Sequence, residues 1–343
     1  MRILVIGNMG YVGPALVRHL RRTHPGYELH GFDAGYFGHC LIGSDRLPEL
    51  DLDLQMVGDV RSLRPDTLRG YDAVIQLAAI SNDPMGKQFE TPTFEINQDA
   101  TVRIARAAAA AGVGSFVFAS SCSVYGVADG PARREGDPVA PMTAYAKSKI
   151  GSERGLAEVE GEMAITCLRF ATACGFSPRL RLDLVLNDFV AAALGQGRIT
   201  VLSDGSPWRP LIDVSDMARA IDWAIHRDTG QGGQFLVVNT GATANNYQVR
   251  DLANAVATAL PGTEVSINTD APVDSRSYRV DFGQFERLAP DHVPQMTLAD
   301  SIQALVAGLR ARQATGPSDL IRLRTLQNHI SSGRLTPELR WAA

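Results

Sequence analysis

Short runs of branched apolar residues alternate with longer helical stretches over the first half of the chain. Strands are predicted at 2–6, 28–32, 54–57, 73–78, 115–119 and 164–170. Stretches such as 93–111 separate these strands and are expected to form helices. This alternation is typical of an α/β fold, in which helices cover both faces of a doubly wound parallel sheet.

The pattern changes after residue 170. It predicts a helix at 214–226, a strand at 235–238, an amphipathic helix at 247–260, a helix at 297–309 and a polar helical tail ending at 339–341. We therefore expect two lobes. The first spans 1–170, with 212–240 packing back on it, and the smaller second one spans 171–343, including the tail.

Composition excludes several classes of partner. The chain has 343 residues, 45% of them hydrophobic, and a net charge of −4, so nothing favours nucleic acid or an anionic membrane as a partner. Its start resembles neither a signal peptide nor a membrane span, and a cytoplasmic protein is expected. Four cysteines without C-x-x-C spacing and seven scattered histidines predict neither a metal site nor a disulfide framework.

The first predicted strand runs directly into a G-x-x-G-x-x-G turn formed by Gly7, Gly10 and Gly13, with Tyr11 and Val12 inside it. Glycines before a helix let the backbone turn tightly and let a pyrophosphate approach the amides at the helix start. The spacing departs from G-x-G-x-x-G, and such a turn can also be purely structural. In this α/β context we expect a Rossmann-type dinucleotide-binding lobe.

Polar and small residues follow the other predicted strands at the same edge of the sheet. Asp33 ends the second strand, where a carboxylate can accept hydrogen bonds from both ribose hydroxyls and would repel a 2′-phosphate, which favours NAD over NADP. Its alternative role is that of a turn residue. Further candidates in these loops are Asp59, Val60, Leu77, Ala78 and Ala79 for the cofactor and Ser81 for the substrate.

Tyr145 and Lys149 lie four residues apart, on one face of a predicted helix. A phenol titrates at about pH 10, and a nearby cation favours its ionised form, so Tyr145 is a candidate acid/base. Ser121 and Ser123 follow the fifth strand and could share protons with the substrate and the phenol. The alternatives are a solvated helix face and a serine-rich turn.

Together, the glycines, Asp33, the Ser-Ser-x-Ser-Val-Tyr-Gly segment and the tyrosine-lysine pair resemble the extended short-chain dehydrogenase/reductases, specifically their nucleotide-sugar epimerase and dehydratase branch. The resemblance implies NAD as cofactor and Ser121, Tyr145 and Lys149 as catalytic residues, with Lys149 binding the nicotinamide ribose. It also implies a homodimer formed through the helices at 93–111 and 143–160.

The same resemblance implies a nucleoside-diphosphate sugar as substrate. Ser123 would contact the sugar, Asn187 would bind the diphosphate, and Arg209 and Arg276 would supply cations. Thr172 stands where the family often has asparagine. The expected reaction is epimerisation at C4 through a 4-keto sugar, and a 4-dehydrogenase or ketoreductase would use the same hydride step.

Other reactions and functions are less favoured. The family's 4,6-dehydratases place Asp-Glu directly after the catalytic Ser/Thr, whereas this chain has Cys122 and Ser123 there. Neither is an acid at neutral pH. Bases for 3,5-epimerisation could come only from Cys122 or Cys174. A non-sugar dehydrogenase and a non-catalytic NAD-binding protein remain as alternatives.

Overall fold

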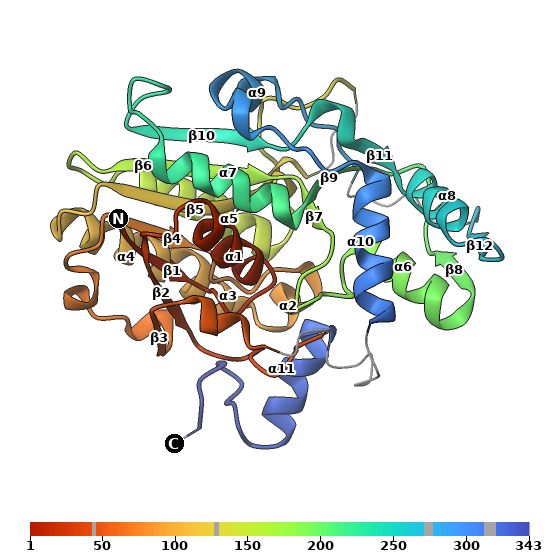
Figure 1. The fold of residues 1–343 in the computed structure, drawn as a ribbon, viewed down its shortest axis with the longest axis horizontal. Helices are drawn as coiled ribbons and strands as arrows, with labels where there is room; N and C mark the ends of the chain where they lie inside the picture. The colour runs from red at the N-terminus through yellow and green to blue at the C-terminus, as the bar shows by residue number, and fades with distance from the viewer. Residues whose placement is uncertain (43–45, 127–129, 271–276, 312–319, 343) are drawn as a thin grey trace.

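A sheet of seven parallel strands forms the centre of the computed structural model, which describes residues 1–42, 46–126, 130–270, 277–311 and 320–342 (Figure 1). The strand order is β10-β6-β5-β4-β1-β2-β3. The strands are β1 (Arg2–Ile6), β2 (Glu28–Asp33), β3 (Leu54–Val57), β4 (Ala73–Gln76), β5 (Ser115–Ser121), β6 (Ala164–Phe170) and β10 (Phe235–Thr240). The predicted doubly wound parallel sheet is thus confirmed.

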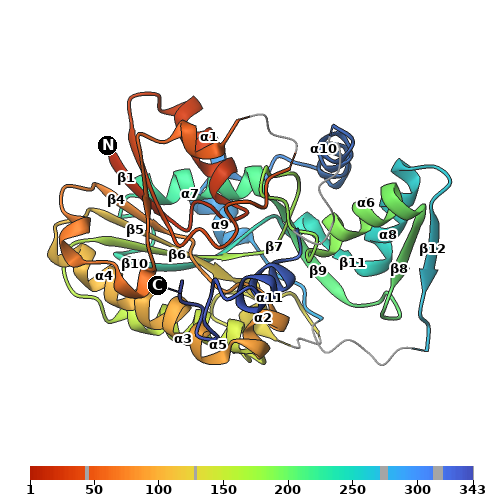
Figure 2. The ribbon, with the colours of Figure 1, turned by 90° about the horizontal axis from the view of Figure 1, so that it is seen from below.

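Helices cover both faces of this sheet (Figure 2). The helices α1 (Gly13–Thr23) and α7 (Val214–His226) lie on one face, and the apolar side of α1 is buried there. On the other face lie α3 (Glu90–Phe94), α4 (Ala100–Ala110) and α5 (Ala144–Ala157), while α2 (Asp83–Gln88) lies beside them. The inner strands are therefore buried on both faces, as their apolar sequences require, whereas the edge strand β3 stays partly exposed.

The predicted helix at 93–111 contains a π-helical segment, η4 (Glu95–Asp99). It carries Asn97, which is fully buried. The Asn97 amide binds both backbone groups of Ile80, at 2.8 and 3.0 Å, and donates to Ser148 Oγ at 3.0 Å. This irregular turn therefore ties the loop after β4 to α5.

The second lobe surrounds its own apolar core, which Leu186, Val190, Leu252, Val256 and Leu305 share. Its elements are α6 (Val185–Gln196), β8 (Arg198–Val201), α8 (Val249–Ala259), β12 (Glu264–Ile267) and α10 (Leu298–Arg310). A sheet of β7 (Thr172–Cys174), β9 (Trp208–Asp213) and β11 (Asn246–Gln248) joins the lobes. Residues 247 and 248, expected to be helical, pair with β9 instead.

The C-terminal segment packs against the first lobe, although the sequence grouped it with the second. It contains α11 (Arg322–Ser331), and the short α9 (Gly283–Leu288) precedes it beside β10 (Figure 1). Leu326, Leu335 and Leu339 join the core that β1 and β4 share. Trp341 Nε1 donates to Ala34 O at 2.6 Å, next to the end of β2. In the described part of the chain, no helix is both long and apolar enough to span a membrane.

Candidate active site

A cavity of about 970 Å³ lies between the carboxyl edge of the central sheet and the second lobe. The predicted site residues that line it are Gly7, Gly10, Tyr11, Val12, Asp33, Asp59, Val60, Leu77, Ala78, Ala79, Ser81, Ser121, Ser123, Tyr145, Lys149, Thr172 and Arg209. Gly13 and Asn187 are not among the lining residues, and Arg276 lies outside the described residues.

The glycine turn lies at one end of the cavity, and its glycines let neighbouring backbone segments pack closely. Gly7 has a φ of 87°, and a Cβ there would lie 2.4 Å from the backbone nitrogen of Ala78. A Cβ at Gly13 would lie 1.9 Å from Asn8 O, so this glycine lets the start of α1 pack on the turn. The N-cap residue Val12 offers no side-chain hydrogen bond to the first turn of α1, which leaves those amides to a ligand.

Asp33 lies at the end of β2, in the same part of the cavity. Its carboxylate accepts hydrogen bonds from the amides of Met9 at 2.9 Å and Gly35 at 2.7 Å, which fixes its orientation. Burial raises its pKa, and these two amides act in the opposite direction. Gly7, Gly10 and Val12 line the cavity together with this carboxylate, an arrangement that fits a dinucleotide such as NAD.

Tyr145 and Lys149 both face the cavity from α5, which begins where Thr143 accepts a hydrogen bond from Ala146 N. The ammonium of Lys149 lies 5.6 Å from the Tyr145 ring centre and donates to Ala119 O at 2.6 Å. Both side chains lie where the spacing predicted. Ser121 lies at the end of β5, facing the same space.

The electrostatics of the pair differ from the expectation. Burial raises the pKa of Tyr145, while a hydrogen bond with Ser121 and the charge of Arg181 lower it. Burial also lowers the pKa of Lys149 to about 7, against the charge of Glu153. Arg181 is thus a cation that favours the Tyr145 phenolate in addition to Lys149, which the sequence suggested for this role.

Arg181 lines the cavity, although the sequence interpretation treated it as an ordinary solvated arginine. It is 8% exposed and comes from the connection between β7 and α6. Its guanidinium donates to Asp183 at 3.0 and 2.8 Å and to Ser81 Oγ at 2.8 Å. The only sequence signal is the alternation Arg179-x-Arg181-x-Asp183, which is indistinguishable from a solvated loop.

The proposed substrate residues fall into different surroundings. Asn187 is fully buried: its amide donates to Tyr11 Oη at 3.3 Å and to Arg181 O at 3.0 Å, and its oxygen accepts from Gly175 N. It fixes the loop before α6 and does not face the cavity. Arg209 lies on β9 and lines the cavity.

Ser123 offers a hydroxyl to a ligand. Its Oγ is buried and has no hydrogen-bond partner among the described residues, and the residue lines the cavity. An unpaired buried hydroxyl is costly, and a bound hydroxyl group would relieve this cost. Thr172 lines the same wall and hydrogen-bonds Tyr278.

The two cysteines nominated as alternative bases lie outside the cavity lining. Cys122 is fully buried, and its thiol donates to Arg169 O at 3.0 Å. Burial raises the pKa of both Cys122 and Cys174 far above neutrality. Neither thiol can serve as a base in the cavity.

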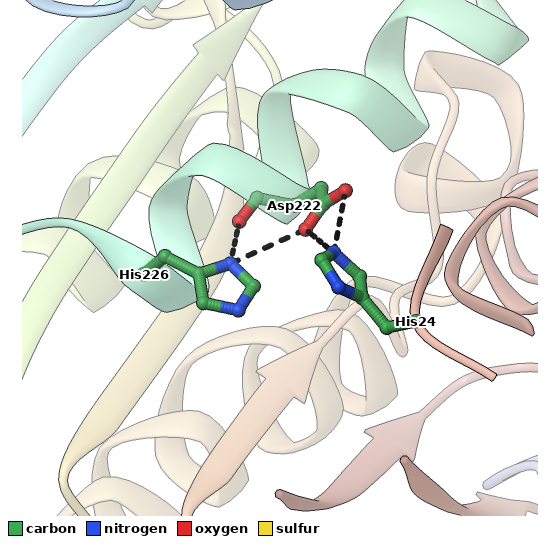
Figure 3. A group of neighbouring side chains, drawn as sticks. All are labelled: His24, Asp222 and His226. Carbon is green, nitrogen blue, oxygen red and sulfur yellow. Dashed lines mark hydrogen bonds and ion pairs between the residues drawn. The ribbon is translucent and has the colours of Figure 1, made fainter. Parts of the chain in front are cut away.

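A cluster outside the cavity brings together residues that are scattered in the sequence (Figure 3). Asp222, on α7, accepts hydrogen bonds from His24 at 2.9 Å and from His19 at 2.7 Å. His226 points at the same carboxylate, with Nδ1 3.2 Å from Oδ1. These side chains have the composition of a metal site, which the sequence spacing did not predict, but here they satisfy one another and connect α1 to α7.

Comparison with known proteins identifies the same family that the sequence motifs resemble. Residues 3–241 match the model of the family described as NAD dependent epimerase/dehydratase. The chain is 28% identical to a UDP-glucose 4-epimerase of Mycolicibacterium smegmatis, over 90% of this chain and 99% of that protein. It is 25% identical to a dTDP-glucose 4,6-dehydratase of Actinoplanes sp., over 92% and 99%.

Solved structures share the fold. One is MoeE5 in complex with UDP-glucose and NAD, with 27% identity, a TM-score of 0.76 and coverage of 90% of this chain and 99% of that one. The NDP-hexosamine 5,6-dehydratase TunA has 23% identity and a TM-score of 0.77, over 91% and 98%. The match to the family model over most of the chain shows that this protein is an NAD-dependent enzyme of the epimerase/dehydratase family.

Proposed function

We propose that the protein is a nucleotide-sugar 4-epimerase that works through a transient 4-keto sugar. The observation that carries the proposal is the arrangement of Ser121, Ser123 and Tyr145 around one cavity with the glycine turn and Asp33. A hydroxyl-bearing substrate held there would meet both an acid/base and a dinucleotide site. The UDP-glucose 4-epimerases among the relatives support the same reaction class.

Tyr145 would remove the proton of the C4 hydroxyl, with Ser121 hydrogen-bonded to both oxygens. The glycine turn and Asp33 would hold NAD, which would supply reversible hydride transfer at C4. For inversion, the ketone must turn so that its other face receives the hydride while Tyr145 returns the proton. The residues that line the cavity include the small Gly126 and Ala173.

The alternative of 4,6-dehydration lacks its acids. The position after Ser121 is a fully buried thiol, and the next is the Ser123 hydroxyl. Some relatives are named as 4,6-dehydratases, so the distinction rests on these side chains and not on overall similarity.

The test is incubation of the purified protein with UDP-, GDP-, CDP- and dTDP-hexoses. Absorbance near 340 nm and product stereochemistry are followed together. We expect a C4-inverted sugar with no net NADH, and loss of this activity in Tyr145→Phe. Tyr247→Phe is the matched control, because this tyrosine is not among the residues that line the cavity.

Stoichiometric NADH without inversion would refute the epimerase and indicate a 4-dehydrogenase. A dehydrated 4-keto-6-deoxy product would refute the argument from the residues after Ser121.

A further inference from the structure

Three buried arginines lie close together beside the cavity, and two of them, Arg181 and Arg322, line it. Arg179, Arg181 and Arg322 are 1%, 8% and 2% exposed. Arg322 begins α11 in the C-terminal segment, whereas the other two precede α6. Arg322 Nη2 donates to the backbone oxygen of Arg179 at 2.7 Å, so segments far apart in the sequence are in direct contact here.

Two of these charges are compensated. Arg179 forms an ion pair with Glu49 at 2.7 Å. Arg181 binds Asp183 through two hydrogen bonds. Among the described residues no carboxylate forms an ion pair with Arg322, and its Nη1 is buried without a hydrogen-bond partner.

Asp183 carries a negative charge that interacts electrostatically with Arg322. Its oxygens, however, are bound by Arg181 and by Asn82. Burial lowers the pKa of Arg322 to about 10, and the charges of the other two arginines act in the same direction. The cluster therefore holds one positive charge in excess, which is costly at a buried position.

Arg322 lies at the wall of the cavity, and its Nη1, unpartnered among the described residues, is buried there. Arg322 lines the cavity together with Phe37, and its guanidinium carbon lies 4.7 Å from the centre of the Phe37 ring. Stacking on a ring leaves the edges of the guanidinium free for hydrogen bonds. Contacts of the C-terminal segment fix the helix: His329 Nε2 lies 2.9 Å from Tyr36 O.

We infer that Arg322 binds a diphosphate group in the cavity, and that the C-terminal segment thereby completes the ligand site. Diphosphate matches the guanidinium in charge and in its paired oxygens. It is present both in NAD and in a nucleoside-diphosphate sugar. Binding of the sugar's diphosphate rests on the proposed function, whereas binding of the NAD diphosphate requires only the family's cofactor.

The test compares Arg322→Gln with Arg324→Gln, an exposed arginine on the same helix. Binding of NAD and of UDP to protein stripped of nicotinamide is measured separately by calorimetry. Charge-assisted hydrogen bonds of this kind predict affinity for at least one ligand about 10- to 100-fold weaker in Arg322→Gln. Arg324→Gln should bind both like the wild type.

The two arms identify the source. Weaker NAD binding alone assigns Arg322 to the cofactor, and weaker UDP binding alone assigns it to the substrate. Unchanged affinity for both would overturn the inference. These readouts do not depend on turnover, so they stay decisive even if the protein is not a 4-epimerase.

A structural role would give another pattern. Without ligand, Arg322→Gln should unfold at the same temperature as the wild type or higher, because it removes a surplus buried charge. Lower thermal stability with unchanged affinity would mean that Arg322 only supports the backbone of Arg179. If Arg322→Gln does not fold, Arg322→Lys takes its place in the test, because lysine keeps the charge but lacks the paired donors of the guanidinium. Wild-type affinity of this variant for both ligands would again overturn the inference.

Discussion

Removing the charge of Glu153 tests how strongly a buried ion pair stabilises α5, the helix that carries Tyr145 and Lys149. Glu153, on α5, and Arg169, on β6, are 5% and 6% exposed. Arg169 donates to the carboxylate through Nε at 2.9 Å and Nη2 at 2.7 Å. Ser120, next to the proposed catalytic serine, donates to the same carboxylate at 2.5 Å.

Glu153→Gln keeps the shape of the side chain but leaves the Arg169 guanidinium without its counter-charge. Breaking one partner of a buried pair typically costs about 3–5 kcal/mol, because the remaining charge is neither solvated nor paired. Nearly complete burial and two direct hydrogen bonds from Arg169 place this pair in that class. We expect a loss of about 3–5 kcal/mol in the free energy of unfolding.

Urea unfolding followed by circular dichroism measures this loss. Glu158→Gln is the control: it removes an exposed pair with Arg106, 3.7 Å apart, at the end of the same helix, and should change stability by less than about 1 kcal/mol. The double variant Glu153→Gln with Arg169→Met should be less destabilised than the sum of the single changes.

A loss below about 1 kcal/mol in Glu153→Gln, or strict additivity in the double variant, would refute the reasoning. Either result would mean that solvent or a rearrangement compensates the charge of Arg169.

Three further outcomes are expected. Arg181→Gln should move the ascending limb of the pH–rate profile to higher pH, because it removes a charge that lowers the pKa of the proposed base; an unmoved limb would contradict this. Gly7→Ala should cost at least about 2 kcal/mol of stability and weaken NAD binding, because backbone strain and a clash with Ala78 coincide there. Gly35 has a φ of 75° and open space around it, so Gly35→Ala should show the cost of strain alone. Equal losses of stability for the two variants in calorimetry would argue against the clash. Asp222→Asn should lower the melting temperature most between about pH 4 and 6.5. The histidines depress the pKa of Asp222 despite burial, so its contribution to stability is lost as pH falls, whereas the pKa of His226 is raised, so its contribution to stability is lost as pH rises. A uniform decrease of the melting temperature at every pH would refute this linkage.

Local sequence patterns determined the fold class and the positions of the proposed catalytic groups. The period of the apolar runs identified the parallel strands, and the ends of such strands meet at one edge of the sheet. The four-residue spacing of Tyr145 and Lys149 placed both on one helix face, a relation that helix geometry fixes without tertiary information. Gly7 and Asp33 were recognisable because each directly follows a predicted strand.

Tertiary structure alone decided which charges surround these groups. Arg181 and Arg322 reach the cavity wall from different segments of the chain. The side chain of Asn187 binds backbone groups, which its position in the sequence does not predict. The packing of the C-terminal segment on the first lobe depends on an apolar surface assembled from distant strands. Burial reversed the expected electrostatics of Tyr145, because the cost of placing a charge in the interior depends on the whole surrounding fold and not on the neighbouring residues in the chain.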